Sequence, residues 1–290
     1  MKYYTYFPGC SSSEGDAKAY GMSAQAVSKA LDVELVELDD WNCCGSTPYS
    51  SLDELASFCL SGRNLALAEK PGYDLVTPCS SCYVMLNRTN SYLKQYPRLK
   101  AKVAEALAAG GLEYHGTVTA RHLLDIFVSD IGYDAITSRV KRNLNGLKVA
   151  PYYGCQIVRP KQGFDHPEWP QSLDKLITCL GAEATNFPLK SRCCGGSLII
   201  SEEAVALDLV RMLLDSALSN GAECLVTVCP LCQMNLDAFQ SRVNKKFKTN
   251  FNLPTLFFTQ LIGVAFGLDD ADLGLQTCIV PVDRVLAKYI

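Results

Sequence analysis

The most constraining feature of this 290-residue sequence is a pattern of cysteines that occurs twice. In each half, a single cysteine is followed by a vicinal pair and then by two cysteines separated by two residues. The intervals are 32 and 34 residues in the first half, and 37 and 34 in the second. The ten positions are Cys10, Cys43, Cys44, Cys79, Cys82, Cys155, Cys193, Cys194, Cys229 and Cys232. The repeat, at an offset of 145 to 150 residues, indicates an internal duplication.

The residues around the cysteines repeat as well. Tyr6-Phe7-Pro8-Gly9-Cys10 corresponds to Tyr152-Tyr153-Gly154-Cys155, and each vicinal pair is followed by glycine. The chain length also suits two domains of average size. We therefore expect an N-terminal domain over residues 1–145 and a C-terminal domain over 146–290, with the boundary at 144–146.

Hydrophobic patterning predicts strands that alternate with helices in both halves. The expected strands are residues 2–7, 34–38, 74–77, 148–153, 182–187 and 224–228, and the expected helices are 18–31, 51–69, 171–180 and 202–219. The apolar stretches 118–127 and 253–268 are assigned to the core, and 120–143 is expected to carry little site chemistry. The predicted fold class is α/β, with two pseudo-symmetric α/β domains, each with a parallel sheet flanked by helices.

The first and fourth cysteines of each set directly follow an expected strand. These are Cys10, Cys79, Cys155 and Cys229. The carboxyl ends of parallel strands meet at one edge of an open α/β sheet, where ligands bind. We therefore expect three chain segments of each half to converge on one site.

Composition narrows the class of protein. The chain is 48% hydrophobic and 20% charged, with a net charge of −3, which is typical of a globular protein and gives no basic footprint for nucleic acid. Its longest apolar run is too short to span a bilayer, and residues 1–4 do not resemble a signal peptide. We expect a cytoplasmic location, where the protein is either free or part of a complex peripheral to the membrane. Thiols stay reduced there, so grouped cysteines indicate metal or redox chemistry.

Five thiolates in each half exceed the four that a zinc ion or an ordinary iron–sulfur cube takes. The vicinal pair favours a polynuclear iron–sulfur site of unusual ligation. Zinc in one or both halves, a redox-active Cys-x-x-Cys pair and a strained vicinal disulfide are the alternatives. The four cysteines that do not repeat are interpreted as small buried hydrophobes: Cys59, Cys179, Cys224 and Cys278.

The doubled pattern resembles the cysteine-rich CCG domains of the HdrB family of heterodisulfide reductase subunits, over nearly the whole chain. This resemblance implies a non-cubane 4Fe–4S cluster in each half, held by the five cysteines of that half. It also implies two partners, the flavin-bearing HdrA and the small ferredoxin-like HdrC of a heterodisulfide reductase complex. The sequence has no Gly-x-Gly-x-x-Gly dinucleotide fingerprint of its own, so flavin or nicotinamide would lie on another polypeptide.

The resemblance therefore implies an oxidoreductase, the catalytic iron–sulfur subunit of a complex that reduces a mixed disulfide to two thiols. The disulfide is expected to bind between the two clusters, one electron coming from each half. No catalytic residue is assigned beyond the cluster cysteines. Weaker candidates for binding an anionic substrate or donating a proton are Arg159, Lys190, Arg192 and His166.

Two other functions stay open from the sequence. One is an electron-relay CCG subunit of a quinone-linked complex, similar to an unusual succinate dehydrogenase subunit, without a substrate of its own. The other is a scaffold with one cluster and one structural zinc ion. The relay predicts no small-molecule pocket at either cluster, and metal counting separates the scaffold from both.

Overall fold

The two halves each contain a four-stranded, fully parallel β-sheet, which confirms the predicted fold class. The computed structural model describes residues 1–13, 15, 17–46, 48–160 and 163–290. The strand order is β2-β1-β3-β4 in the first sheet and β6-β5-β7-β8 in the second, so the two sheets have the same topology. The strands are β1 (Lys2–Tyr6), β2 (Val33–Glu37), β3 (Leu75–Thr77), β4 (Ala120–His122), β5 (Lys148–Tyr152), β6 (Glu183–Ala184), β7 (Cys224–Thr227) and β8 (Thr255–Phe257).

The sequence predicted six of these strands, but not β4 and β8. Each of the two is three residues long and passes directly into a helix. Each lies in an apolar run that continues into the helix, and a run of this kind does not separate strand from helix. Both strands occupy the same position in their sheets, beside β3 and β7 respectively.

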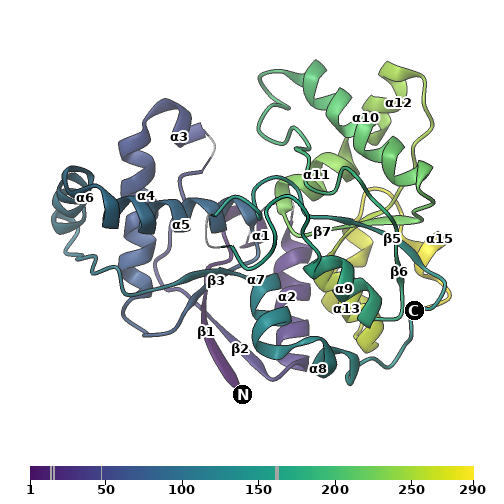
Figure 1. Ribbon diagram of the computed structural model, residues 1–290, viewed down its shortest axis with the longest axis horizontal. Helices are drawn as coiled ribbons and strands as arrows, with labels where there is room; N and C mark the ends of the chain where they lie inside the picture. The colour runs from purple at the N-terminus through teal and green to yellow at the C-terminus, as the bar shows by residue number, and fades with distance from the viewer. Residues whose placement is uncertain (14, 16, 47, 161–162) are drawn as a thin grey trace.

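Two groups of helices form separate lobes on the outer sides of the molecule (Figure 1). The first lobe consists of α3 (Pro48–Leu52), α4 (Glu54–Ala68), α5 (Ser80–Gln95) and α6 (Pro97–Ala109). The second lobe consists of α10 (Glu203–Ser219), α11 (Pro230–Ala238) and α12 (Gln240–Phe247). Residues 51–69 were expected to form one helix, but Asp53 interrupts it, because its carboxylate accepts a hydrogen bond from Ala56 N and begins α4.

A third group of helices joins the two halves. It comprises α2 (Lys18–Ala30), α7 (Leu123–Asp125), a π-helical turn (Ile126–Ile131), α8 (Tyr133–Thr137), α9 (Ser172–Cys179), α13 (Phe258–Phe266) and α14 (Asp270–Leu273). Helix α2 of the first half packs against α13 and α14 of the second, and α8 packs against α9. At this junction the rings of Tyr20 and Phe257 stack with centroids 4.1 Å apart. One apolar core therefore runs through both halves.

The remaining elements are short: α1 (Cys10–Ser13), a 3₁₀ turn (Leu275–Thr277) and α15 (Asp283–Leu286). The change from the first sheet to the second falls between β4 and β5. Within the described residues, no helix is long and apolar enough to cross a membrane.

Candidate metal centres

Six of the ten repeated cysteines lie after a strand or at the start of a helix, and the two vicinal pairs lie in the loops after β2 and β6. Cys10 begins α1 after β1, and Cys155 follows β5. Cys79 and Cys229 are the N-cap residues of α5 and α11, with the second cysteine of each pair three residues further on in the first turn. The unsatisfied amides of a helix N-terminus favour a negatively charged thiolate. The parallel topology thus brings these sulfurs to one edge of each sheet.

The five cysteines of the first half form a connected set of thiols. Side-chain hydrogen bonds link Cys10 to Cys43, Cys43 to Cys44, Cys44 to Cys82 and Cys82 to Cys79. All five line one cavity of about 190 Å³. Leu231 of the second half forms part of its wall, so the cavity lies where the halves meet.

The second half repeats the arrangement. Hydrogen bonds link Cys155 to Cys193 and Cys232 to Cys229, and Cys194 Sγ lies 3.5 Å from Cys232 Sγ. Gly195 N donates to Cys193 Sγ at 3.3 Å, the type of backbone contact that stabilises a thiolate.

The two thiol sets meet at Cys79 and Cys229. The Cys79 thiol donates a hydrogen bond to the Cys229 sulfur, which raises the pKa of Cys79 well above its usual range. Donation from Cys232, and then from Cys79, holds the pKa of Cys229 well below its usual range. Both side chains are buried. The five thiols of the first half are therefore connected to Cys229, Cys232 and Cys194 of the second half.

Other thiols of each set are also stabilised as thiolates by their neighbours. Hydrogen bonds from Cys43 and Cys82 hold the pKa of Cys44 well below its usual range. A hydrogen bond from Cys155 lowers the pKa of Cys193 to about 6, and the positive charge of Arg159 lowers it further. The thiolate is the form that binds metal, so each set contains at least one thiol held toward the metal-binding form, while neighbours and burial raise the pKa of the others.

Glycine lets the backbone pass close to one sulfur of each set. Gly9 has φ = +73°, and a Cβ built there would lie 3.1 Å from Cys82 Sγ. Gly154 has φ = +69°, and its Cβ would lie 3.0 Å from Cys232 Sγ. A larger residue at either position would crowd the sulfur and strain the backbone.

The donor chemistry fits the iron–sulfur clusters that the resemblance implies, because thiolates are the ligands of such clusters. The described residues contain no group of three or more His, Cys, Asp or Glu side chains ready to hold a single metal ion. The thiols instead contact one another in pairs along a connected set.

Three side chains of the first half hold one carbonyl of the second. Val228 O, directly before Cys229, accepts hydrogen bonds from His122 Nε2 at 3.1 Å, Ser80 Oγ at 3.2 Å and Tyr20 OH at 3.3 Å. His122 Nδ1 accepts from Leu124 N at 3.1 Å, so Nε2 carries the proton that is donated. We call these three side chains the Val228 clamp. It fixes the segment that presents Cys229.

The expectation that residues 120–143 carry little site chemistry was wrong, since His122 comes from this segment. The sequence placed a histidine between Arg121 and an apolar run, but only the register of β4 beside β3 turns it toward Val228. Burial lowers the pKa of His122 to about 4, so the ring is neutral at physiological pH.

The four weaker candidates lie in different surroundings. Arg159 is exposed, and its charge acts on Cys193. Lys190 is buried, with Nζ 3.0 Å from an Asp174 oxygen. Arg192 is exposed, and its carbonyl accepts from Tyr152 OH at 2.7 Å. His166 is exposed, and its Nδ1 accepts from the backbone amides of the two residues after Pro167.

The four non-repeating cysteines were interpreted as small buried hydrophobes. Cys224 is fully buried in β7, as expected. The prediction of burial was wrong for the other three, because they are only half-buried: Cys59, Cys179 and Cys278. Helical spacing shows which face of a helix packs against the core, but not whether a residue lies at the centre or at the border of that face.

The duplicated sheets and paired thiol sets define a cysteine-rich protein with two α/β units. A comparison with known families matches the CCG cysteine-rich domain to residues 4–87 and again to 149–237. The chain belongs to this family, together with the HdrB proteins of heterodisulfide reductases.

Relatives of two kinds match most of the chain. The 8-methylmenaquinol:fumarate reductase membrane anchor subunit of Wolinella succinogenes is 33% identical, covering 98% of this chain and 99% of the relative. The HdrB protein of the ferredoxin/F420H2-dependent CoB-CoM heterodisulfide reductase of Methanosarcina acetivorans is 32% identical, covering 89% and 87%. A heterodisulfide reductase HdrB-like protein of Archaeoglobus profundus is 31% identical, covering 100% and 99%.

The fold also resembles a solved structure, that of a hypothetical protein from Helicobacter pylori. The TM-score is 0.77 at 20% sequence identity, with 97% of this chain covered. This chain spans 52% of that protein, and the likeness concerns the fold alone.

Proposed function

We propose that this chain is the catalytic iron–sulfur subunit of a heterodisulfide reductase-type complex. In this proposal each set of five cysteines holds one non-cubane 4Fe–4S cluster, and the complex reduces a mixed disulfide to two thiols. The observation that carries it is the contact between Cys79 and Cys229, through which the thiols of the two halves meet. The relatives named as HdrB proteins of heterodisulfide reductases support it.

Reduction of one disulfide takes two electrons, and each cluster would supply one of them when bound. The residues of this chain hold the two sources together: Cys79 and Cys229 meet directly, and the Val228 clamp fixes the second segment against the first half. Arg159, whose charge acts on Cys193, would stabilise negative charge on an anionic substrate. His166 is exposed and able to exchange protons with solvent.

The proposal includes the setting of the chain. A flavin-bearing HdrA partner and a ferredoxin-like HdrC partner would deliver the electrons, since a thiol-based centre needs a source of reducing equivalents. We propose a cytoplasmic location, with the complex peripheral to the membrane in the quinone-linked case. We also keep residues 1–145 and 146–290 as the two domains.

A second candidate is favoured by a specific observation. The relative from Wolinella succinogenes matches over 98% of this chain, and its name describes a membrane anchor subunit of a quinol-linked fumarate reductase. In that case the same two clusters would relay electrons without binding a substrate of their own.

The first experiment counts metals. The whole chain is purified under anaerobic conditions, and iron, acid-labile sulfide and zinc are measured per chain. Two 4Fe–4S clusters correspond to about eight irons and eight sulfides without zinc. About four irons with one zinc would contradict the proposal and make one half structural.

A matched pair of variants then tests the assigned ligands. Cys79→Ala removes a cysteine at the junction of the two sets, and Cys224→Ala removes a buried cysteine that does not repeat. We expect Cys79→Ala to lose about half of the iron and Cys224→Ala to keep it all. Equal iron contents in the two variants would refute the assignment.

A third experiment separates reductase from relay. The reduced whole chain is mixed with CoB-CoM heterodisulfide or glutathione disulfide, and released thiols are counted against electrons consumed. Release of two thiols for every two electrons supports the reductase. Reduced clusters that stay unchanged with every disulfide, yet pass electrons to a quinone analogue in the assembled complex, would favour the relay.

A further inference from the structure

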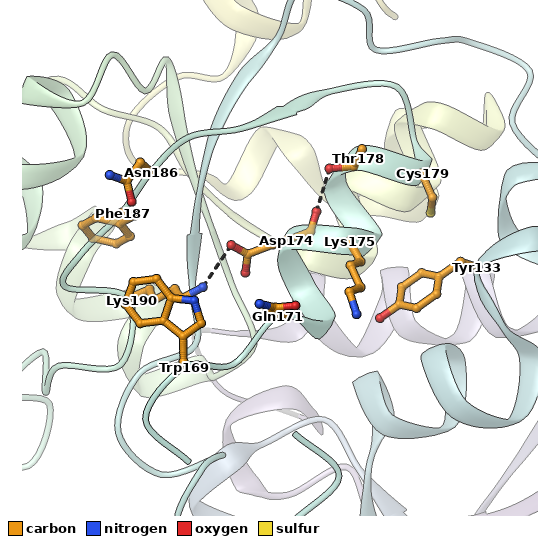
Figure 2. A pocket seen from close by; sticks show the side chains of 10 residues that line it. All are labelled: Tyr133, Trp169, Gln171, Asp174, Lys175, Thr178, Cys179, Asn186, Phe187 and Lys190. Atoms are coloured by element: carbon orange, nitrogen blue, oxygen red, sulfur yellow. Dashed lines mark hydrogen bonds and ion pairs between the residues drawn. The ribbon is translucent and has the colours of Figure 1, made fainter. Parts of the chain in front are cut away.

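Away from the thiols, two adjoining cavities form one groove at the junction of the halves. Their volumes are about 530 and 590 Å³, within the range of small-molecule sites. They share four lining residues: Tyr133, Trp169, Gln171 and Lys175. Figure 2 shows these side chains between α8 of the first half and α9 of the second, with Trp169 opposite the helix. We call this feature the α9 groove.

The acidic groups of the α9 groove already have hydrogen-bond partners. Asp174 accepts from Lys190 Nζ at 3.0 Å and from Tyr153 OH. Asp165 accepts from the backbone amides of Gln171 and Ser172 at 2.8–3.1 Å. The ammonium of Lys190 also lies 5.0 Å from the centre of the Trp169 ring. These contacts hold the walls rigid and leave the two carboxylates unavailable to a cation.

The donors of the groove, in contrast, are not all used. Lys175 lines both cavities, and within the described residues it has no ion pair. Ser172 lines the second cavity; its side chain is only 7% exposed, yet its hydroxyl has no hydrogen-bond partner there. A buried hydroxyl without a partner costs free energy unless a ligand or water satisfies it. The groove therefore has one ammonium without an ion-pair partner among the described residues, beside a hydroxyl without a hydrogen-bond partner.

The opposite wall is aromatic. Trp169 is 56% exposed, and Tyr133 and Phe187 add ring surface in the first cavity. An exposed indole ring beside a charged pocket is typical of a surface that stacks against a planar or apolar ligand.

We propose that the α9 groove binds an organic anion, with its acidic oxygens at Lys175 and Ser172 and its planar or apolar body against Trp169. The ammonium of Lys175, which has no carboxylate partner among the described residues, favours one negative charge on the ligand. This site goes beyond the proposed function, because none of the ten repeated cysteines lines it.

Residues of the groove also contact the sequence neighbours of one cysteine in each set. Phe164 of the second cavity packs against Tyr83, which follows Cys82, with ring centroids 6.4 Å apart. The carbonyl of Lys190 accepts from Tyr153 N and Gly154 N, directly before Cys155.

The test is calorimetric titration of the whole, anaerobically purified chain with 2-naphthoate as the probe. Its uncharged analogue, 2-naphthylmethanol, measures the part of the affinity that comes from the ring alone. We expect naphthoate to bind about tenfold more tightly than the alcohol, because a charged hydrogen bond is lost. We expect Lys175→Met and Trp169→Ala each to weaken naphthoate binding by about tenfold or more.

The matched control is Lys102→Met, which removes an exposed lysine from α6 and should leave the affinity unchanged. Melting curves confirm that each variant is folded, and Ser172→Ala gives a second, smaller change of the same site. No binding of naphthoate to the wild type would overturn the proposal. Equal affinity for the alcohol and the anion, or unchanged affinity in folded Lys175→Met, would overturn it as well.

Discussion

The Val228 clamp predicts a large effect for a single substitution far from any cysteine in the sequence. His122→Leu keeps an apolar side chain of similar bulk in a fully buried position. It removes the hydrogen bond from Nε2 to Val228 O and the acceptor that Leu124 N uses. Ser80 and Tyr20 still donate to Val228 O, so this carbonyl stays satisfied.

The cost follows from these two bonds. Loss of one ordinary hydrogen bond costs about 1 kcal/mol, and a buried donor left without a partner costs about 1–3 kcal/mol. We therefore expect a destabilisation of about 2–4 kcal/mol. For a chain of this size, such a change lowers the apparent Tm by about 5–10 °C.

The assay is the apparent Tm of the anaerobically purified chain near pH 7.5, with iron per chain measured on the same sample. The control is His115→Leu, because His115 is exposed and lies only at the 4.0 Å limit of an ion pair with Glu113. The control should change Tm by less than about 2 °C. If the two variants melt at the same temperature, the clamp does not stabilise the junction of the halves.

Three further predictions follow from the same structure. Gly9→Ala would place a Cβ 3.1 Å from Cys82 Sγ at a positive φ, so we expect the iron content per chain to fall. The control, Gly72→Ala, adds a Cβ in open space and should leave the iron content unchanged. Equal iron contents in the two variants would contradict this prediction. Arg121→Gln removes the hydrogen bonds of 2.7–2.9 Å from Arg121 to Asp125 and Asp130. We expect the free energy of unfolding to fall by about 2–3 kcal/mol, measured as a lower Tm. An unchanged Tm would show that these hydrogen bonds do not stabilise the fold. The pKa of His122 is lowered by burial from 6.5 to about 4, so the unfolded chain binds a proton that the folded chain does not. The free energy of unfolding should fall by up to about 1.4 kcal/mol per pH unit as the pH drops from 6.5 toward 4. The Tm of His122→Leu should therefore depend less steeply on pH in this range than the Tm of the wild type. Equal slopes for the two proteins would show that His122 does not cause the pH dependence.

The sequence determined much of the framework. The doubled cysteine pattern indicated the duplication, and the position of the first and fourth cysteines of each set after an expected strand predicted that the sulfurs gather at the sheet edges. These predictions depend on local rules, because strand alternation and helix periodicity are properties of neighbouring residues. Six strands were accordingly predicted, and the two that lie inside apolar runs continuing into a helix, β4 and β8, were not.

The junction between the halves was decided by tertiary structure alone. The repeat indicates that there are two thiol sets, but not that Cys79 donates to Cys229, 150 residues away in the sequence. Nor does it show that His122, Ser80 and Tyr20 meet at Val228, or that Lys175 and Trp169 line one groove. These contacts depend on how α2, α8, α9 and α13 pack between the two sheets. Packing of this kind is set by the combined shape of surfaces from both halves, and no local pattern in either half encodes it.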